Sequence, residues 1–473
     1  MAEPEVRERV LALLRKHGWN ATSFQAVESG FSYWFDGQGA CVSYVDTGGA
    51  WVAAGAPIAA PRRLARAAER FAEAAAAQGR RSVFFATEAR FSRRTGFRAH
   101  LIGEQPVWDP RTWTDQPARA RALEPQIRRA RRKGVEVRAV PPEVLRDPAH
   151  PLRLAIEGLI ARWLAARPMA PMGFLVDVQP FAFVEERRCF VAERAGAVVG
   201  FLAAVPVYAR AGWLFEDLLR DRSAPNGTAE LLVDAAMRAV AAEGSRYVTL
   251  GLAALAGATP GWLALARRLG ALLYDFDGVY AFRAKLRPDR WEPLYVSTRP
   301  GGRPGTLAGT VAGTVAIWDS LKAFARGRLI GFGVATLLRG PAFVVRMLAA
   351  LLVPWIVLLA CAGERWFPGP AAKAGWLSFD AVLAVALFSL AAQWRRWLGL
   401  LLAVAVSADA LVTVAQLALD DLPRRGGGWG ATLIFGIAAA APALAAVILW
   451  NAINHRRLRP GRRRRDASSR SIP

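Results

Sequence analysis

The chain has 473 residues, 53% of them hydrophobic, and a formal net charge of +24. This length exceeds that of a usual single domain and predicts about three structural units. The three cysteines lie far apart and the four histidines are scattered, which argues against a disulfide framework and against a zinc site. We expect neither a bound metal nor a cofactor.

The first segment of the chain, residues 1–18, is highly charged and has the pattern of an amphipathic helix. A cleaved signal peptide needs an apolar stretch behind a short basic region, and this segment lacks one. We therefore expect the amino-terminal part of the protein in the cytoplasm. A charge balance this basic predicts nucleic acid or anionic lipid as a partner.

Expected strands and helices alternate before residue 300. The first series has two neighbouring strands, an alanine-rich helix and a buried strand, at residues 40–45, 50–54, 61–78 and 82–87. The second has two strands around a turn, a third strand, a helix and a fourth strand, at residues 189–194, 198–206, 212–219, 228–243 and 247–252. This recurrence predicts two similar α/β units, at residues 1–145 and 146–298.

The densest polar cluster follows the expected strand at residues 212–219. Asp217 and Arg220 lie near the end of this strand, a turn follows at residues 225–227, and Thr228 is the expected N-cap of the next helix. Backbone N–H groups at such a helix start can hold a phosphate or carboxylate, and α/β folds place sites at strand ends. The alternative interpretation is a solvated turn with a surface ion pair.

A second cluster lies at residues 280–287, where cationic and apolar residues alternate. This alternation predicts a strand with three cations on one face. The cations are Arg283, Lys285 and Arg287, and the opposite face carries Phe282, Ala284 and Leu286. A row of cations suits an anionic ligand, and lysine offers a compact ammonium that arginine lacks. The alternative is an ordinary solvated strand face.

A third cluster is a run of cations expected on one helix. Its members are Arg119, Arg121, Arg128, Arg129, Arg131, Arg132 and Lys133. A broad basic surface of this kind can bind the backbone of a nucleic acid or face an anionic lipid surface. A helix that is merely solvated is the third possibility.

Longer apolar runs begin after residue 340. A glycine- and proline-rich linker leads into a stretch that resembles a basic amphipathic helix on a membrane surface, although a packed connector fits equally well; together they span residues 299–340. Four segments within residues 341–452 have the length of transmembrane helices, at residues 342–362, 376–393, 397–419 and 431–450. The chain is therefore expected to be a multi-pass membrane protein.

Arginine placement predicts the orientation of these four segments. The arginines on one side of a four-span arrangement are Arg339, Arg346, Arg395, Arg396, Arg456, Arg457 and Arg459, followed by 462–465. The positive-inside rule then places both ends of the chain, including the basic tail at residues 453–473, in the cytoplasm. Asp380 and Asp409 fall inside expected spans, where carboxylates are often functional. Asp380 lies near the end of its span and Asp409 can pair with a neighbouring helix, so we do not infer transport from them.

Four stretches, in order, resemble the C-terminal catalytic domain of the phosphatidylglycerol lysyltransferases, the multiple peptide resistance factor family. They are the basic helix at 127–140, Asp-Leu-Leu-Arg with Pro-Asn-Gly at 215–227, Gly-Leu-Ala-Ala-Leu at 251–255 and the closing segment at 274–295. Gly55-Ala-Pro57 is a fainter match. The sequence has Leu252 and Ala254 where the family motif has Met and Pro, and Arg283 where it has the first lysine of Phe-Lys-x-Lys.

The resemblance implies tandem acyltransferase folds of the GNAT type ahead of the helical region. It also implies aminoacyl transfer, of lysyl or alanyl type, from an aminoacyl-tRNA to the hydroxyl of a lipid such as phosphatidylglycerol at the inner membrane. By position, the implied catalytic residues are Asp217, Arg220 and Lys285. The implied substrate-binding residues are Glu216, Asn226, Gly227, Gly251, Arg283 and Arg287, and contacts to tRNA or anionic lipid are expected from Arg128, Arg131, Arg132 and Lys133.

Two other functions fit the same fold. An acetyl-CoA-dependent acetyltransferase would need a Gln/Arg-x-x-Gly-x-Gly/Ala loop before its main helix, where this chain has Ser-Ala-Pro-Asn-Gly at residues 223–227. A membrane-tethered protein that binds tRNA or lipid without catalysis is the other alternative. The presence of Asp217, Arg220 and Lys285 favours an enzyme over it.

Overall fold

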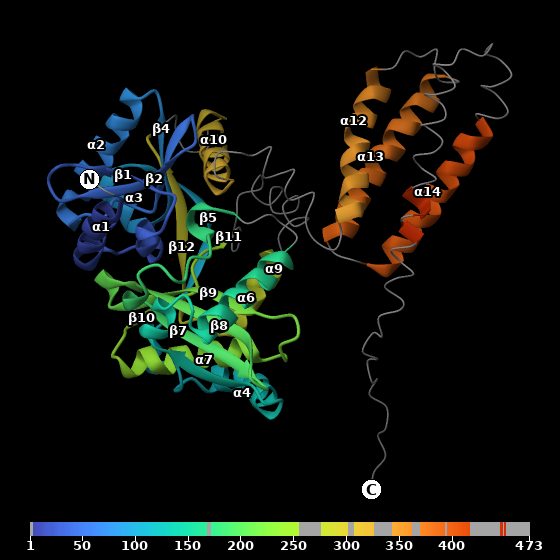
Figure 1. Ribbon diagram of the computed structural model, residues 1–473. Coiled ribbons are helices and arrows are strands. Elements are labelled where there is room, and N and C mark those ends of the chain that lie inside the picture. Colours follow the sequence, from blue (N-terminus) through green and yellow to red (C-terminus); the bar gives the residue numbers. More distant parts are fainter. Residues whose placement is uncertain are drawn as a thin grey trace, which may run out of the picture. The chain divides into compact units, whose positions relative to one another are not determined.

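The computed structural model describes residues 3–167, 172–254, 276–300, 307–325, 343–361, 369–392, 395–416, 445–447 and 449–450. The chain divides into two compact units, Met1–Thr336 and Leu337–Pro473. The first holds a large mixed sheet with helices on its faces, and the second consists of apolar helices (Figure 1).

A single sheet runs through the first unit in the order β1-β2-β3-β4-β12-β5-β10-β9-β8-β7-β6, with β11 paired to β5. The strands are β1 Ser32–Phe35, β2 Cys41–Asp46, β3 Ala50–Ala54, β4 Arg81–Glu88, β5 Arg98–Trp108, β6 Glu136–Val140, β7 Arg188–Arg194, β8 Ala197–Val207, β9 Gly212–Arg220, β10 Tyr247–Thr249, β11 Ala253–Ala254 and β12 Arg290–Thr298. Most neighbours are antiparallel, whereas β3 pairs with β4, and β10 with β9, in parallel.

Helices connect and cover these strands. They are α1 Glu3–His17, α2 Leu64–Ala77, α3 Ala89–Thr95, α4 Pro117–Arg132, α5 Pro142–Arg146, α6 Pro151–Ala165, α7 Thr228–Ala242, α9 Phe276–Lys285 and α10 Leu307–Phe324, with the 3-10 helix η1 at Ala21–Val27. The second unit contains α12 Phe343–Cys361, α13 Pro370–Ala392 and α14 Arg396–Gln416.

Strand β8 shows why the second half of the sheet carries helices on both faces. Its residues form a nearly continuous apolar run, as expected for a strand buried on both sides. Leu202 and Ala204 belong to the apolar cluster around α7, while Phe201 and Ala203 belong to the cluster around α6. Since successive side chains of a strand point to opposite faces, α6 and α7 cover opposite faces of β8 and β9.

The two series of elements join in the middle of the sheet. Strand β12, which ends this part of the chain, lies between β4 and β5 of the first series, and β5 pairs with β10 of the second. Arg210 reinforces the junction through ion pairs with Glu88 and Glu292. The two halves therefore share one sheet, and the proposed boundary near residue 145 stays a prediction.

Most expected elements of the α/β region are confirmed, but residues 280–287 are not a strand. Residues 276–285 form helix α9, so the cations expected in a row have different surroundings. Phe282 and Leu286, which are four residues apart, both pack into the core around α7, as helical spacing requires. An alternating pattern over eight residues was too short to distinguish the two periods.

Helix α10 packs against the sheet. Ala316 and Ala323 are buried in a cluster with residues of β3, β4 and β12. Asp319 is fully buried and accepts two hydrogen bonds of 3.0 Å from Arg81. Residues 307–325 are therefore a packed connector rather than a helix that lies only on a membrane surface; residues 326–340 lie outside the described residues.

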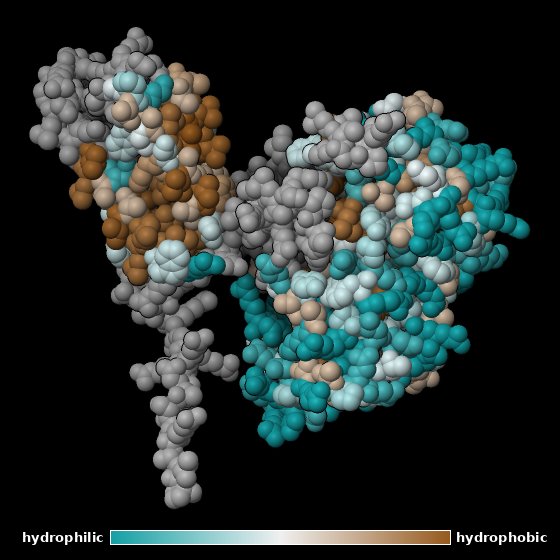
Figure 2. Space-filling model, turned by 180° about the vertical axis from the view of Figure 1, so that it is seen from behind, coloured by the Kyte–Doolittle hydropathy of each residue, from teal (hydrophilic) through white to brown (hydrophobic). Residues whose placement is uncertain are grey.

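The expectation of four membrane spans is met only in part. Among the described residues, one helical stretch, Lys373–Ala391 in α13, has both the length and the mean hydropathy of a span. The apolar parts of α12 and α14, Leu348–Cys361 and Trp397–Val412, are shorter. Figure 2 shows the apolar surface of these helices in brown. Most of the fourth expected span and the whole basic tail lie outside the described residues.

The ion pair between Arg81 and Asp319 should contribute measurably to stability. Arg81→Ala is expected to lower the free energy of unfolding by about 1–3 kcal/mol, because the buried carboxylate loses its two donors. The loss stays below that of a fully buried pair because 56% of the Arg81 side chain is exposed. Arg80→Ala, which removes an exposed pair with Asp46, is the control with an expected effect of about 0–0.5 kcal/mol. Urea unfolding followed by tryptophan fluorescence would contradict this role if the two losses were equal.

Candidate active site

The site is built on an irregular part of β9. β10 pairs with β9 only from Gly212 to Leu214, and in the described structure the later residues of β9 pair with β8 alone. The register between β8 and β9 shifts where Ala203 and Ala204 face Asp217 and Phe215, so Glu216 is an extra residue in a β-bulge. Bulges re-aim side chains and are frequent beside active sites.

The bulge brings Glu216 and Asp217 to the same region, on the face covered by α6 and η1. Asp217 lies opposite Ala203, whose neighbours on that face belong to the α6 cluster. Glu216 accepts hydrogen bonds from Nε2 of Gln25 in η1 at 2.5 Å and from Nη1 of Arg187 at 2.8 Å. A residue of the first half of the chain thus meets the bulged strand of the second.

Arg187 is the centre of this buried network. Its Nη2 donates to Oε1 of Glu28 at 2.6 Å, and its Nε donates to the carbonyl of Ala182 at 2.8 Å. The side chain is 0% exposed, and that of Glu28 is 1% exposed. Burial alone would lower the pKa of Arg187, but Glu216 and Glu28 raise it, so the guanidinium remains charged.

The same network holds more acidic than basic groups. Burial, followed by the charge of Glu216, raises the pKa of Asp217 well above its usual range, although Arg187 opposes the shift. The pKa of Glu28 is raised for the same two reasons. A buried carboxyl group whose pKa is raised by its surroundings is a candidate for proton transfer, which makes Asp217 a candidate proton acceptor.

Arg220 lies on the other face of β9. It pairs with Gly200, and a Cβ atom on Gly200 would come within 2.9 Å of Leu232 in α7. The Arg220 side chain is exposed, and its Nη1 donates to Oδ1 of Asn226 at 3.4 Å. Asp217 and Arg220, which the sequence places near the end of the same strand, therefore occupy opposite faces of that strand.

Lys285 also belongs to the face covered by α7. Its Nζ donates to Oε1 of Glu230, in the first turn of α7, at 2.6 Å. Arg283, two residues earlier in α9, donates to the carbonyls of Leu250 and Gly251 at 2.6 and 3.0 Å. Arg283 thus ties α9 to the end of β10 instead of joining Lys285 in a row of cations.

Arg287 lies beyond the end of α9. It has a left-handed φ of 51°, and its side chain is exposed. Its backbone carbonyl accepts hydrogen bonds from Arg119 at 2.8 and 3.2 Å. The structure gives Arg287 a backbone contact in place of the shared strand face that the sequence suggested.

The turn before α7 differs from the expected one. Gly227, rather than Thr228, precedes the helix, and no side chain caps the first N–H groups of α7 in this described segment. The hydroxyl of Thr228 donates to the carbonyl of Pro225 at 2.7 Å instead. Gly227 has a φ of 97°, and a Cβ there would lie 2.0 Å from the carbonyl oxygen of Gln126 in α4. This close approach places the start of α7 against α4.

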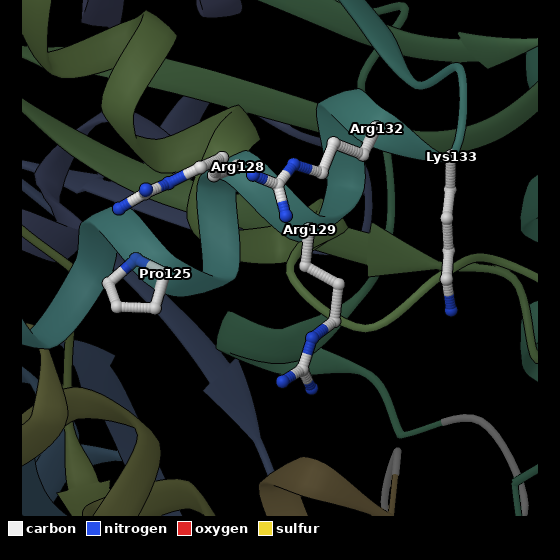
Figure 3. A pocket seen from close by; sticks show the side chains of 5 residues that line it. All are labelled: Pro125, Arg128, Arg129, Arg132 and Lys133. Atoms are coloured by element: carbon white, nitrogen blue, oxygen red, sulfur yellow. The ribbon is translucent and has the colours of Figure 1, made fainter. Parts of the chain in front are cut away.

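Helix α4 carries the basic surface, and Figure 3 shows Arg128, Arg129, Arg132 and Lys133 lining a hollow together with Pro125. All four cations are exposed, and the side chains of Arg129 and Lys133 extend to the same side. Arg131 is also exposed but does not line this hollow.

Arg119, at the start of the same helix, is not part of the basic surface. It is 1% exposed, and its Nη2 bonds to Asp289 at 2.7 Å. It therefore holds the segment after α9 against α4. The expectation that Arg119 joins the basic surface was wrong, because this one side chain of the first turn of α4 points inward, where Asp289 and backbone carbonyls bind its guanidinium.

The site also includes residues that sequence reasoning missed. Gln25, Glu28 and Arg187 were not among the expected site residues. Glu28 and Arg187 are 159 positions apart, and neither lies in a motif that signals an ion pair. The sequence offers one weak signal for Glu28. This charged residue directly follows the apolar residues 26–27, which indicates that its side chain lies near the core.

Comparison with known proteins places the chain in a family. A model of the phosphatidylglycerol lysyltransferase C-terminal domain matches residues 11–298. The chain belongs to this family. No curated protein sequence matches it.

Two solved structures show the same GNAT-like fold. One is the C-terminal domain of a candidate lysylphosphatidylglycerol synthetase from Agrobacterium fabrum, with 19% identity and a TM-score of 0.57, covering 69% of this chain and 99% of that one. The other is L-PGS from Bacillus licheniformis, with 20% identity and a TM-score of 0.55, covering 67% and 97%. At these identities the likeness concerns the fold, and the family assignment rests on the sequence model.

The raised pKa of Asp217 predicts an unusual stability change. Asp217→Asn is expected to raise the melting temperature at neutral pH and to change it little near about pH 4. A carboxyl whose folded pKa is raised contributes stability below its unfolded pKa, and this contribution is lost as the pH rises through the folded pKa. Asparagine carries no charge at any pH and avoids that loss.

Asp221→Asn is the control with the opposite sign. Hydrogen bonds from the backbone of Ser223 and from Arg162 lower the pKa of Asp221, so its carboxylate stabilises the fold above its unfolded pKa. The control should therefore lose stability at neutral pH. Melting curves between about pH 4 and 8 decide the matter, and a destabilised Asp217→Asn at neutral pH would contradict the assignment.

Proposed function

We propose that this protein transfers an aminoacyl group, of lysyl or alanyl type, from an aminoacyl-tRNA to the hydroxyl of a membrane lipid such as phosphatidylglycerol. The observation that carries the proposal is the bulged end of β9. It presents the buried Asp217 on one face of the sheet and Arg220 on the other, beside the ion pair between Lys285 and Glu230. Membership in the phosphatidylglycerol lysyltransferase domain family supports the same reaction.

The reaction is a transesterification. The lipid hydroxyl oxygen bonds to the ester carbonyl carbon, the bond from that carbon to the ribose oxygen breaks, and the ribose leaves as an alcohol. A proton must therefore leave the lipid hydroxyl and a proton must reach the ribose oxygen. Asp217, whose pKa is raised by burial and by Glu216, is proposed to accept the first proton.

Cations on the α7 face are proposed to stabilise negative charge. Lys285 is held at 2.6 Å from Glu230, which fixes its ammonium beside the first turn of α7. The N–H groups of that turn have no side-chain cap, and Arg220 lies at the same end of the helix. Such an arrangement suits a phosphate group or the oxyanion that forms during acyl transfer.

The basic face of α4 is proposed to contact the phosphodiester backbone of the tRNA. Its cations follow helical spacing and lie beside the start of α7, where Gly227 meets α4. A run of phosphates along a nucleic-acid backbone matches such a row of arginines better than a single phosphate does. The same face could meet anionic lipid, which is the alternative outcome of the test below.

The second unit is proposed to hold the enzyme at the cytoplasmic side of the inner membrane. Large apolar side chains are exposed on all three of its long described helices, including Leu351, Val357, Val382, Val385 and Leu411. Surface of this kind is stable against lipid. The four-span arrangement, with both ends in the cytoplasm, is part of this proposal.

Expression in cells that lack aminoacylated lipids tests the reaction. The full-length chain should produce a new ninhydrin-positive lipid, and mass spectrometry would identify its amino acid and its acceptor. Asp217→Asn and Lys285→Ala are each expected to lower the yield by roughly 10²–10⁴-fold, since each removes a group proposed to act in transfer. Asp115→Asn and Lys16→Ala, which change exposed side chains of the same types, should retain the product. An unchanged lipid extract despite good expression would rule the proposal out.

The role of α4 predicts a specific kinetic change. The double variant Arg128→Glu/Arg132→Glu should raise KM for aminoacyl-tRNA and leave kcat nearly unchanged, because the two side chains contact substrate phosphates away from the reacting atoms. The dependence of log KM on log salt should become shallower by about one for each phosphate that the variant no longer neutralises. Arg66→Glu, at an exposed position on α2, is the control. A change in lipid dependence with unaltered tRNA kinetics would assign this face to lipid instead.

A further inference from the structure

Helix α10 lies beyond the part of the chain that the family model matches. That model ends at residue 298, and α10 spans Leu307–Phe324. The helix nevertheless packs against β3, β4 and β12 of the sheet, beside which it lies in Figure 1. The properties of the family domain therefore do not explain why this helix is present.

One face of α10 is fixed to the sheet. Ala316 and Ala323 are buried there, and Asp319 accepts the two hydrogen bonds of the ion pair described above. Gly313 lies so close to β5 that a Cβ atom on it would come within 2.7 Å of Nδ1 of His100. These contacts determine which side of the helix faces away from the sheet.

The opposite face of α10 exposes large apolar side chains. Val311, Trp318 and Leu321 are 52%, 52% and 49% exposed. Their spacing of seven and three residues places them along one side of the helix, where Thr314 is also exposed. The described part of the first unit has six exposed large apolar residues, so half of them gather on this one helix face. A concentration of this kind indicates an interaction surface.

The surroundings of this face favour an anionic lipid surface over a protein partner. Residues 325–342, which lead from α10 to α12, include three arginines and no acidic residue. Cations next to an apolar helix face that carries a tryptophan are typical of segments at the surface of an anionic bilayer. Three half-exposed side chains are by themselves too few for a stable protein interface, which buries about 800 Å² per partner.

The covalent link to the second unit makes a small lipid contact effective. Helix α12 begins at Phe343, 19 residues after Phe324, and a chain of this length spans at most about 65 Å. The exposed apolar side chains of α12, such as Leu351 and Val357, are proposed above to lie in lipid. A bilayer that holds α12 is then within reach of α10 at a high effective concentration, so a weak contact suffices.

The end of α10 also contacts a segment that belongs to the surroundings of the candidate active site. The backbone N–H of Gly173 donates to the carbonyl of Phe324 at 2.9 Å, and the rings of Phe174 and Phe324 pack edge to face with centroids 5.2 Å apart. The next residue, Leu175, accepts the hydrogen bond of 2.8 Å from Gln25 of the buried network. Helix α10 and the site are therefore held together by a short series of direct contacts.

We propose that the exposed face of α10 docks onto the anionic surface of the membrane that holds the second unit. Val311, Trp318 and Leu321 enter the boundary between headgroups and acyl chains, while the opposite face of the helix stays on the sheet. Docking fixes the orientation of the first unit and holds the candidate active site beside the lipid surface. This last consequence rests on the proposed transfer to a lipid hydroxyl, whereas the docking itself does not.

Fluorescence of a label on α10 tests the docking. The fluorophore NBD is attached to Leu321→Cys in the full-length protein with Cys361→Ser, because the two other cysteines are buried. Leu154→Cys is the matched control, since Leu154 is exposed to a similar extent, 52%, on α6. In nanodiscs of phosphatidylcholine and phosphatidylglycerol, the emission at position 321 should shift to shorter wavelength and be quenched by brominated lipid. The emission at position 154 should do neither.

Two results of this measurement would overturn the proposal. One is equal emission at the two labelled positions. The other is a shift at position 321 that brominated lipid does not quench, which would assign the face to a contact with protein. Nanodiscs of phosphatidylcholine alone should give weaker quenching, because the cations after α10 lose their partner there. Equal quenching in the two kinds of nanodisc would reject an anionic surface as the partner.

A variant of the exposed face separates docking from catalysis. The triple substitution Val311→Ser/Trp318→Ser/Leu321→Ser should lower transfer to phosphatidylglycerol in nanodiscs by at least about tenfold. Transfer to dihexanoyl phosphatidylglycerol, an acceptor that dissolves in water, should not change. The melting temperature should stay close to that of the wild type, because exposed positions tolerate substitution. Trp318→Ser alone serves if the triple variant fails to fold, and wild-type activity of the folded variant in nanodiscs would overturn the role of docking.

The docking and the proposed function can fail separately. Emission at position 321 that lipid quenches, in a protein that makes no aminoacyl lipid, would leave the docking standing and reject the transfer. Formation of the lipid product without quenching at position 321 would reject the docking and keep the transfer.

Discussion

The fold of the site depends on one buried interaction, the bridge that Arg187 makes between Glu28 and Glu216. Glu28 follows η1 in the first half of the chain, and Glu216 is the extra residue of the bulge in β9. Charges with almost no exposure are stable only when paired, so the bridge requires both halves to be folded and in contact. The pairing of β12 with β4 and β5 in the centre of the sheet also requires that the two halves fold together.

The bulge also separates two chemical environments. On the face of the sheet that α6 and η1 cover, carboxyl groups and unpartnered oxygens surround Arg187. Beside α7 and α4, exposed or half-exposed cations dominate, including Arg220 and Lys285. Strand β9, which pairs with β10 only as far as Leu214, lies between the two environments.

Several features could be predicted because their physical signals are local. The turn at residues 46–49, the alternation into strands and the long apolar run of β8 all depend on neighbours in sequence, and the structure confirms these elements. The strand predicted at residues 280–287 was wrong. A short alternating run also fits a helix whose Phe282 and Leu286 pack on the same side. The prediction that Thr228 is the N-cap of α7 was also wrong. The close approach of α4 requires a glycine at position 227, and this glycine precedes the helix without providing a side-chain cap.

The sequence by itself determined the order of the elements, the position of the polar turn after β9 and the existence of a separate apolar unit, because these follow from composition and periodicity along the chain. The resemblance in sequence also pointed to Asp217, Arg220 and Lys285. Only the tertiary structure decided that Asp217 and Arg220 occupy opposite faces and that Arg119 is buried. It alone joined Gln25 and Glu28 to Arg187, since an ion pair across 159 positions arises from packing and leaves no periodic trace in the sequence.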